Sequence, residues 1–371
     1  MPRLRVAGVF AALSLTTDLA SGVPFEKGLR TCVVATAFAG ALGWSRDERL
    51  AVFHTALLRS VGCTSHAPEN AALFVDDTAF QAALKRLDPG DPAVFTAQLA
   101  RFGDWAPGRG LAQRFTAVAA TEGPRAARAG CEVSRALGGR LGLPAAAIDA
   151  LDDVYERWDG LGIPDGRSGE QLSTVGRAVH VAEQAVFAHA DGGVAGARAE
   201  VTRRAGGHLD PDLASAFLRD ADALLAVLEV PDLAAAVVAA EPGPGAVVGP
   251  DGLDGLCAAL AVVVDLKGTH LLGHSGHVAA VADAAAGAAG IADGERATLR
   301  AAAHLHDLGR AAVSSEVWDR PGPLGAADRE RVRLHAYWTD RILRRCPALA
   351  PLADLAAAHH ERVDGSEPLP T

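Results

Sequence analysis

Histidines and one aspartate are concentrated in the C-terminal third of this 371-residue chain. Eight of the thirteen histidines lie between residues 270 and 360, in segments whose small and apolar neighbours are typical of packed helices. Neutral imidazoles together with a carboxylate can bind a divalent transition-metal ion. The side chains that we expect to be ligands are His274, His306, Asp307, His335, His359 and His360.

The spacing of these residues fits a site built between helices. Adjacent helical residues project about 100° apart, so His306 with Asp307, or His359 with His360, can line two sides of one cavity. A carboxylate flanked by histidines can bridge two ions about 3.5–4 Å apart, the separation used in phosphoryl chemistry. Gly309 is expected to end the helix that carries His306. A single histidine on an apolar helix face is more often a core residue, but five with an aspartate on four successive helices favour a metal site.

The other three histidines of this region are not predicted to be ligands. His304 lies two positions from His306, about 200° around a helix, and is expected to face elsewhere. His270 and His277 share a helix face with His274 by their spacing, either as supporting groups or as surface residues.

Helices must position these side chains, because the sequence favours helices almost everywhere. Apolar residues recur at helical spacing, and aromatic residues make up only 5% of the chain. Gly-rich breaks such as residues 191–193 separate the expected helices. The segment EPGPGAVVGPDG at 241–252 is the predicted linker between a domain at 1–240 and a domain at 241–371. We therefore predict an all-α fold.

The two domains look like diverged copies of one helical unit. YERWDG at 155–160 matches HERVDG at 360–365, and LLRSVG at 57–62 matches HLHDLG at 304–309. The two offsets differ by 42 residues, which places an insertion of that length within residues 63–129 of the first copy. In this alignment the first copy loses the ligands: Lys27 replaces His274, and Arg59 and Ser60 replace His306 and Asp307.

Charge and cysteine content argue against several classes of function. The formal net charge of −10 disfavours binding to a nucleic-acid duplex, which needs a basic surface. The five cysteines occur singly, as expected for buried thiols in a reducing cytoplasm. Residues 6–15 resemble a short signal peptide, but Thr16, Thr17 and Asp18 interrupt the apolar run and favour a buried first helix. No stretch approaches the length of a membrane span.

Residues 265–365 resemble the HD-GYP branch of the HD-domain phosphohydrolase superfamily. The matching segments are DLKGTHLLGHSGHV, HLHDLGR, RPGPLG with the later histidine of RLHAYW, and AAHHERVDGS. The resemblance implies that the six side chains above are metal ligands, with Asp307 bridging two iron or manganese ions that supply a hydroxide for attack on phosphorus. It implies cyclic di-GMP as substrate and catalytic roles for Asp307 and Arg310. Arg310 stands where the family has lysine, and with Glu361 and Asp364 it is the predicted substrate contact.

Two departures from the family pattern matter. The family continues HHExxDGSG with Tyr-Pro and a helix that brings a further aspartate, whereas this sequence reads Glu-Pro-Leu-Pro-Thr after Ser366. We therefore expect a C-terminal truncation that weakens metal binding, and no helix-turn-helix for DNA binding. In the first copy Glu183 falls at the position of the family's last carboxylate, with almost no partners expected, so this copy is predicted to be a metal-free scaffold.

The sequence thus predicts a cytoplasmic protein of two tandem HD-like bundles, the first degenerate and the second binding metal. Its predicted function is a metal-dependent phosphodiesterase in signalling that acts on a phosphorylated small molecule or cyclic dinucleotide, without membrane association and with a homodimer left open. The alternative is a regulatory protein that binds partners but no longer turns over substrate. His306→Ala should abolish metal binding and activity together, whereas His54→Ala should change neither.

Overall fold

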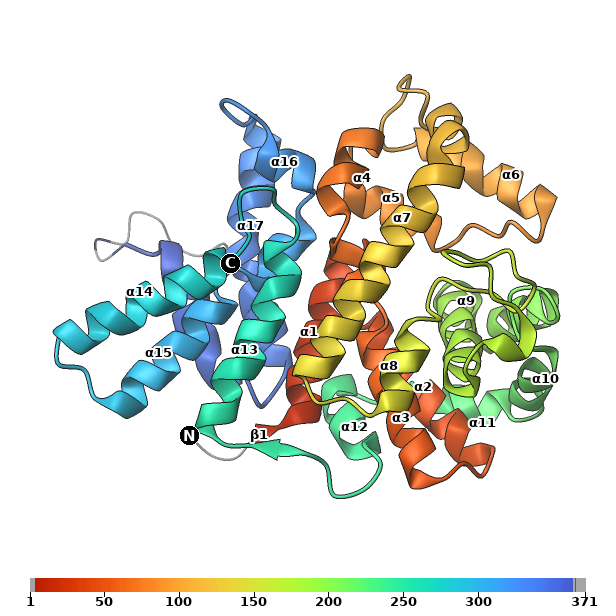
Figure 1. The fold of residues 1–371 in the computed structure, drawn as a ribbon, viewed down its shortest axis with the longest axis horizontal. Coiled ribbons are helices and arrows are strands. Elements are labelled where there is room, and N and C mark those ends of the chain that lie inside the picture. The colour runs from red at the N-terminus through yellow and green to blue at the C-terminus, as the bar shows by residue number, and fades with distance from the viewer. Residues whose placement is uncertain (1–3, 363, 365–371) are drawn as a thin grey trace. The chain divides into compact units, whose positions relative to one another are not determined.

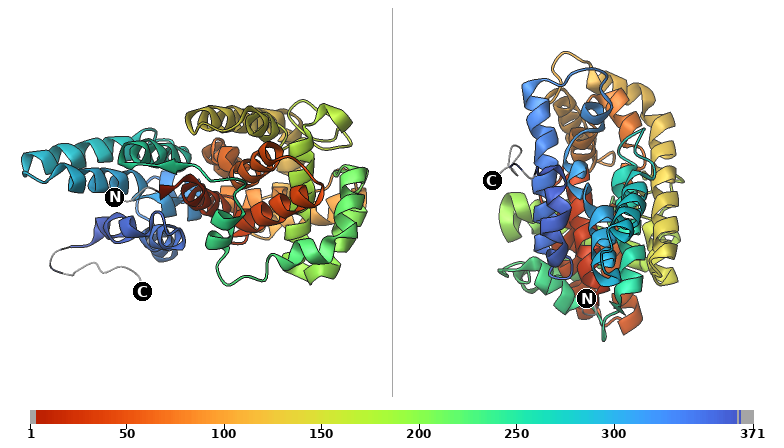
Figure 2. Two further views of the ribbon diagram at one scale, coloured as in Figure 1. Left: turned by 90° about the horizontal axis from the view of Figure 1, so that it is seen from below. Right: turned by 90° about the vertical axis from the view of Figure 1, so that its left-hand side faces the viewer.

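The computed structural model describes residues 4–362 and 364 and confirms the all-α class. The described part contains eighteen α-helices and two short strands, β1 (Leu4–Arg5) and β2 (Val247–Val248), which pair antiparallel (Figures 1 and 2). The chain divides into two compact units. Unit 1 combines residues 1–23, 63–79 and 245–371, and unit 2 combines residues 24–62 and 80–244. Neither unit is continuous in sequence, which differs from the single predicted boundary at residue 240.

Unit 1 contains the predicted histidine site. Its helices are α1 (Val6–Ala20), α4 (Ala67–Phe74), α13 (Pro250–Asp265), α14 (His274–Ala288), α15 (Asp293–Leu305), α16 (Ser315–Asp319), α17 (Ala326–Arg345) and α18 (Ala353–Ala357). Short 3-10 helices connect them: η4 (Leu308–Ala312), η5 (Ala350–Leu352) and η6 (Ala358–His360). The helices α14 and α15 form a hairpin that packs against α13 (Figure 1).

The first helix, α1, is buried along almost its whole length, as the sequence predicted. It packs against η4, α13 and α17, all of unit 1. A Cβ atom added at Gly8 would lie 3.0 Å from the Cβ atom of Ala348, so a larger residue here would require the helix or this neighbour to shift by a few tenths of an ångström. Because α1 is buried on all faces, it requires partners on every side.

Residues 63–79 join unit 1 through Asp77, a carboxylate that is almost fully buried. Asp77 accepts hydrogen bonds from the Lys267 ammonium at 2.7 Å, the Ser314 hydroxyl at 2.8 Å and the Ser315 amide at 2.7 Å. Part of the segment in which the sequence predicted an insertion therefore belongs to unit 1. Helix α5 (Asp77–Leu84) begins in unit 1 and ends in unit 2.

Unit 2 is organised around a long helix that is broken in the middle. Its helices are α2 (Lys27–Ala41), α3 (Arg46–Leu58), α6 (Pro92–Ala100), α7 (Leu111–Arg140), α8 (Ala145–Leu151), α9 (Thr174–Arg204), α10 (Pro211–Arg219), α11 (Ala221–Ala226) and α12 (Leu233–Ala240). The 3-10 helices η1 (Val61–Thr64), η2 (Arg101–Gly103) and η3 (Gly169–Gln171) lie in the connections. Helix α9 packs against α2, α3, α8 and α10. Its backbone leaves the helical conformation at Gly192 and Gly193, which confirms the predicted break.

In the described part of the chain, no helix combines the length and apolar character that crossing a bilayer requires.

Candidate metal centre

The centre is built on a turn that leaves α15 and crosses close to α17. Helix α15 ends at Leu305, and His306 and Asp307 follow before η4 begins. A Cβ atom at Gly309 would lie 1.9 Å from the carbonyl oxygen of His335, so only glycine allows the two elements to approach. Gly309 therefore does not end the helix, as the sequence had suggested; it is required by this close contact.

Thr339 of α17 fixes the same crossing with two hydrogen bonds. Its hydroxyl accepts from the Gly309 amide at 2.9 Å and donates to the carbonyl oxygen of His306 at 3.0 Å. The side chain is fully buried. The sequence analysis missed this residue, because a threonine within a helix gives no signal of a contact in another element.

Three of the predicted histidine ligands share one ring orientation, with Nδ1 against a backbone carbonyl oxygen. The Nδ1 atom of His306 lies 2.8 Å from the carbonyl oxygen of Ala303, that of His359 lies 2.8 Å from Ala356, and that of His335 contacts Val332. A carbonyl oxygen only accepts, so Nδ1 must be the protonated nitrogen in each ring. In the neutral ring Nε2 then carries a lone pair that can bind a metal.

The two oxygens of Asp307 each face two of these imidazoles. Oδ2 lies 3.5 Å from Nε2 of His274 and 3.3 Å from Nε2 of His306. Oδ1 lies 3.5 Å from Nε2 of His335 and 3.7 Å from Nε2 of His359. One buried carboxylate thus joins side chains from four helical segments, as the spacing of the motif predicted.

The sixth predicted ligand, His360, completes the second group. Potential ligand atoms of His335, His359 and His360 lie within 4.8 Å of one another, and so do those of His274, His306 and Asp307. His360 is exposed and His274 is partly exposed, whereas His306, Asp307 and His335 are buried. The cluster therefore has a closed interior and an accessible side.

Burial sets the charge state of the imidazoles. It lowers the pKa of His335 and lowers that of His359 to about 4, so both rings are neutral at pH 7. Burial alone would raise the pKa of Asp307, but hydrogen bonds from His274 and His306 and the charge of Arg310 hold it well below its usual range. Burial opposes protonation of His306, yet its hydrogen bond to Asp307 raises the pKa of this ring. A metal ion would have to displace that proton.

The contact between the His335 and His359 rings indicates a site for a cation. The Nε2 atoms of His335 and His359 are 3.0 Å apart. Both are acceptors in the neutral rings, because both Nδ1 atoms donate to the backbone. Two lone pairs at this distance are satisfied by a shared cation, and the donor set of imidazoles with a bridging carboxylate suits iron, manganese or zinc. The residues present therefore fit the divalent ions predicted from the sequence.

Arg310 lies beside the Asp307 carboxylate, and its guanidinium stacks on the ring of Trp318. Its Nη1 atom is 3.2 Å from Oδ2 of Asp307, and its guanidinium carbon lies 3.8 Å from the ring centroid of Trp318. The indole nitrogen of Trp318 donates to the backbone oxygen of Arg310 at 3.3 Å, and its ring also contacts His335. The sequence analysis missed Trp318, because no local pattern relates this tryptophan to Arg310 or His335.

Asp265 is a third residue that the sequence analysis missed. This buried carboxylate accepts from the Ser275 amide at 3.2 Å and from its hydroxyl at 2.7 Å. It therefore holds the first turn of α14, where His274 begins the helix.

The structure also gives the positions of the remaining histidines and of the predicted substrate contacts. His304 approaches Asp254, at 3.8 Å, and not Asp307, as predicted from its position on the helix. His270 and His277 are exposed. Glu361 and Asp364 are exposed as well, and their roles as substrate contacts stay predictions. The expected truncation concerns residues 365–371, which lie outside the described residues.

The positions of unit 2 that align with the ligands hold an ion-pair cluster. Lys27 of α2 contacts one carboxylate oxygen of Glu183 of α9, and Nη2 of Arg59 lies 2.6 Å from the other. Burial would raise the pKa of Glu183, but Arg59 and Lys27 lower it to about 2. The expectation that Glu183 has almost no partners is wrong, because two protein cations lie at the positions aligned with His274 and His306.

Comparison with known families decides the assignment of the C-terminal region. The family model described as the HD domain matches residues 259–368, which include every predicted ligand. Residues 259–368 are an HD domain. The fold of this HD domain thus brings together the ligands that its motifs had predicted.

One relative matches far beyond the HD domain, and a second matches over a length similar to that of the domain. The 3′3′-cGAMP-specific phosphodiesterase 3 of Vibrio cholerae is 29% identical over 374 residues, which covers 95% of this chain and 79% of the relative. The 3′3′-cGAMP-specific phosphodiesterase 2 of the same organism is 29% identical over 109 residues, or 29% of this chain and 21% of the relative. The crystal structure of a cyclic GMP-AMP-specific phosphodiesterase of V. cholerae superposes with a TM-score of 0.68 at 23% identity, covering 96% of this chain and 83% of that one.

These findings confirm the predicted family, the HD-domain phosphohydrolases, and with it the class of enzyme, a hydrolase. The structural match supports the fold across both units. Assignment to the HD-GYP branch stays a prediction.

Proposed function

We propose that this protein is a metal-dependent phosphodiesterase that hydrolyses a cyclic dinucleotide. The observation that carries the proposal is the Asp307 carboxylate, whose two oxygens each face two imidazole nitrogens at 3.3–3.7 Å. Such a carboxylate is suited to bridge two ions. The HD-domain match and the relatives support the same class of reaction.

The residues divide into two sets of ligands. His274 and His306 would hold one ion with Oδ2 of Asp307, and the other ion would lie with Oδ1 between the remaining ligands, His335, His359 and His360. When bound, divalent ions lower the pKa of water and offset the charge of a phosphate group. The chain itself contributes the orientation of the rings, because the Nδ1 contacts to the backbone direct Nε2 toward the centre.

Arg310 is suited to bind the phosphate of the substrate. Its guanidinium is held between Asp307 and the face of Trp318, and its Nε atom has no hydrogen-bond partner among the described residues. A guanidinium presents several donors in one plane and matches phosphate oxygens better than an ammonium does. The replacement of the family's lysine by Arg310 therefore keeps the charge and adds directionality.

The substrate is proposed from two sources that agree on its class. The sequence predicts cyclic di-GMP, whereas the names of the relatives specify 3′3′-cGAMP. Both are cyclic dinucleotides with two phosphodiester groups, and a centre of this kind acts on the phosphodiester group. The choice between them depends on contacts to the bases.

Hydrolysis assays on the purified chain test the proposal. Iron- or manganese-loaded protein should cleave bis(4-nitrophenyl) phosphate and at least one of 3′3′-cGAMP and cyclic di-GMP, and the ratio of rates identifies the preferred base. Metal binding without cleavage of any of the three would refute the enzyme and favour the alternative of a binding or regulatory protein. The inactive control is His306→Ala.

A further inference from the structure

Arg310 and Trp318 form a stacked pair beside the metal centre. The guanidinium carbon lies over the indole ring, 3.8 Å from its centroid, which is within the contact distance of about 3.5–4.0 Å between two carbon atoms. Arginine stacks on aromatic faces in this way, and its N–H donors stay in the plane of the guanidinium. The ring therefore holds the group without occupying its donors.

The protein uses only part of the hydrogen-bonding capacity of Arg310. Its Nη1 atom lies 3.2 Å from Oδ2 of Asp307, and Nε and Nη2 have no hydrogen-bond partner among the described residues. The side chain is 17% exposed, so it lies at the accessible side of the centre. An anion that reaches this side meets a cation with unpaired donors, which suits a phosphate group.

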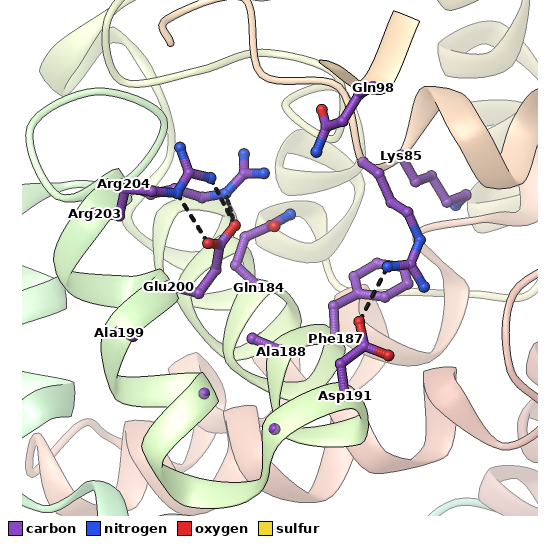
Figure 3. A pocket seen from close by; sticks show the side chains of 13 residues that line it. Lys85, Gln98, Gln184, Phe187, Ala188, Asp191, Ala199, Glu200, Arg203 and Arg204 are labelled. Carbon is purple, nitrogen blue, oxygen red and sulfur yellow. Dashed lines mark hydrogen bonds and ion pairs between the residues drawn. The ribbon is translucent and has the colours of Figure 1, made fainter. Parts of the chain in front are cut away.

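Arginines beside the cavity of unit 2 are held in a different way. This cavity has a volume of about 420 Å³ and lies along α9 (Figure 3). Its Arg203 lies 2.8 Å from carboxylate oxygens of both Glu200 and Asp88, so carboxylates fix its direction and offset its charge. Arg310 has the single carboxylate of Asp307, which also faces four imidazoles. Its second support is a neutral ring, which leaves more of its charge for a ligand.

The helix that carries Trp318 is anchored in the interior of unit 1. Helix α16 begins after Ser314, whose hydroxyl donates to the buried carboxylate of Asp77 at 2.8 Å, and the Ser315 amide donates to the same oxygen at 2.7 Å. Val317 of α16 is buried, whereas Trp318 is half-buried. The indole nitrogen also donates to the backbone oxygen of Arg310 at 3.3 Å. The ring is thus fixed relative to the residue on which it stacks.

We propose that Trp318 is a positioning residue, whose ring directs the unpaired donors of Arg310 toward the phosphate group of the substrate. The proposal rests on the proposed function, because it requires a phosphate at the centre. A lysine ammonium has no plane for a ring to orient, so Trp318 should matter much less with lysine at position 310. The tryptophan and the replacement of the family's lysine by Arg310 would then be one functional unit.

A second role of the ring has to be distinguished from this one. The Trp318 ring also contacts His335, with the two centroids 5.8 Å apart and the rings nearly perpendicular. If the indole served only to support this predicted ligand, its removal would reduce metal binding whatever residue stood at position 310. Coupling to Arg310 together with an unchanged metal content therefore separates positioning from support.

A double-mutant cycle on the manganese-loaded chain tests the proposal. The substrate is bis(4-nitrophenyl) phosphate, a diester without bases, so that the rates report contacts to the phosphate. Trp318→Leu should lower kcat/KM about tenfold with arginine at position 310 and less than about twofold in the Arg310→Lys background. Trp318→Phe, which keeps a ring, should retain most of the parent value.

Calorimetric titration of inorganic phosphate gives a readout that does not depend on turnover. Trp318→Leu should weaken phosphate binding about tenfold in the parent and much less in Arg310→Lys. The metal content should be the same in all four proteins. The matched control, Trp44→Leu, replaces a half-buried tryptophan of unit 2 and should change neither phosphate affinity nor kcat/KM.

Three results would overturn the proposal: equal effects of Trp318→Leu in the parent and in Arg310→Lys, loss of metal in Trp318→Leu, or no phosphate binding by the manganese-loaded parent. Coupling in phosphate affinity without cleavage of any diester would support the positioning role and refute only the proposed hydrolysis. Circular dichroism melting verifies the fold of each variant. Trp318→Met, which also removes the ring face, takes the place of Trp318→Leu in the same cycle if that variant does not fold.

Discussion

Single atoms decide what the centre can bind. Each Nδ1 atom that donates to a backbone carbonyl oxygen forces the lone pair of its ring onto Nε2, toward Asp307. The backbone of three separate helical segments therefore fixes the tautomers, and no additional carboxylates are needed for this purpose. The tightest steric condition on the same centre is at Gly309, where the turn after α15 meets α17.

Gly309→Ala should therefore destabilise unit 1. The added Cβ atom would lie 1.9 Å from the backbone oxygen of His335, so α17 or the turn must shift. We expect a loss of about 2 kcal/mol or more in the free energy of unfolding, together with weaker metal binding. Urea denaturation measures the first quantity. Gly255→Ala, at an exposed position of α13 with no neighbour within 4 Å, should stabilise the protein slightly, and equal effects of the two variants would contradict this account.

At the residue scale, the metal ligands could be predicted from the sequence, but the residues that hold them in place could not. His306, Asp307 and the later histidines occur in motifs with fixed spacing, so their types and positions were sufficient. Thr339 and Trp318 act through contacts between elements far apart in the sequence, and no local pattern distinguishes them from other helical residues. Contacts of this kind become visible only when helices are packed.

Helices of unit 2 are joined by the buried pairs of Glu183 with Lys27 and Arg59. Glu183→Gln would leave two buried cations facing a neutral amide, so unfolding should become easier by about 3–5 kcal/mol. Urea denaturation at neutral pH measures the loss. Arg135→Gln removes one partner of an exposed pair with Asp152 and should change stability little. A cost below about 1 kcal/mol for Glu183→Gln would show that the cluster adds nothing to the packing of α2, α3 and α9.

The stability of unit 2 should depend on pH through His54, a histidine of helix α3. Burial lowers the pKa of this ring from 6.5 to about 4, so as the pH falls the unfolded chain takes up the proton first. The contribution of His54 to the free energy of unfolding is fully present above pH 6.5. As the pH falls from 6.5 to 4 this contribution is lost, which lowers the free energy of unfolding by at most about 3 kcal/mol. Denaturation at several pH values should show a smaller decline over this range in His54→Gln than in the parent. Parallel declines would exclude His54 as the cause.

Elements were predictable where their signals were local. The break in α9 follows from two adjacent glycines at 192 and 193, and the buried first helix follows from the composition of residues 6–15. The end of α15 was placed too late, because Gly309 resembled a helix terminator when its role is to permit the contact with α17. Local patterns thus give the elements, but close approaches between them require the tertiary structure.

At the scale of the molecule, the chain forms two units whose segments alternate along the sequence. Helix α1 and residues 63–79 belong to unit 1 with the HD domain, so unit 1 cannot be obtained by cutting at residue 240. The sequence predicted the repeat and the all-α class but not this exchange, because an apolar helix can pack against any apolar surface. The cytoplasmic location stays a prediction, and the homodimer stays open.

Removal of metal should weaken unit 1 and leave unit 2 unchanged. Ions that bind only the folded state stabilise it by about 4 kcal/mol at a thousandfold excess over the dissociation constant. In calorimetry, adding a chelator should therefore lower the midpoint temperature of the thermal transition of unit 1 by several degrees. The His306→Ala variant should not show this response. A chelator effect that persists in His306→Ala would place the ions elsewhere.

The most direct test of the central claim is the metal content of the purified chain, measured together with its phosphodiesterase activity. The account predicts about two iron or manganese ions per chain, loss of both metal and turnover in His306→Ala, and retention of both in His270→Ala, which replaces an exposed histidine of the same unit. Protein that binds no metal, or a His306→Ala variant that keeps both metal and turnover, would contradict it.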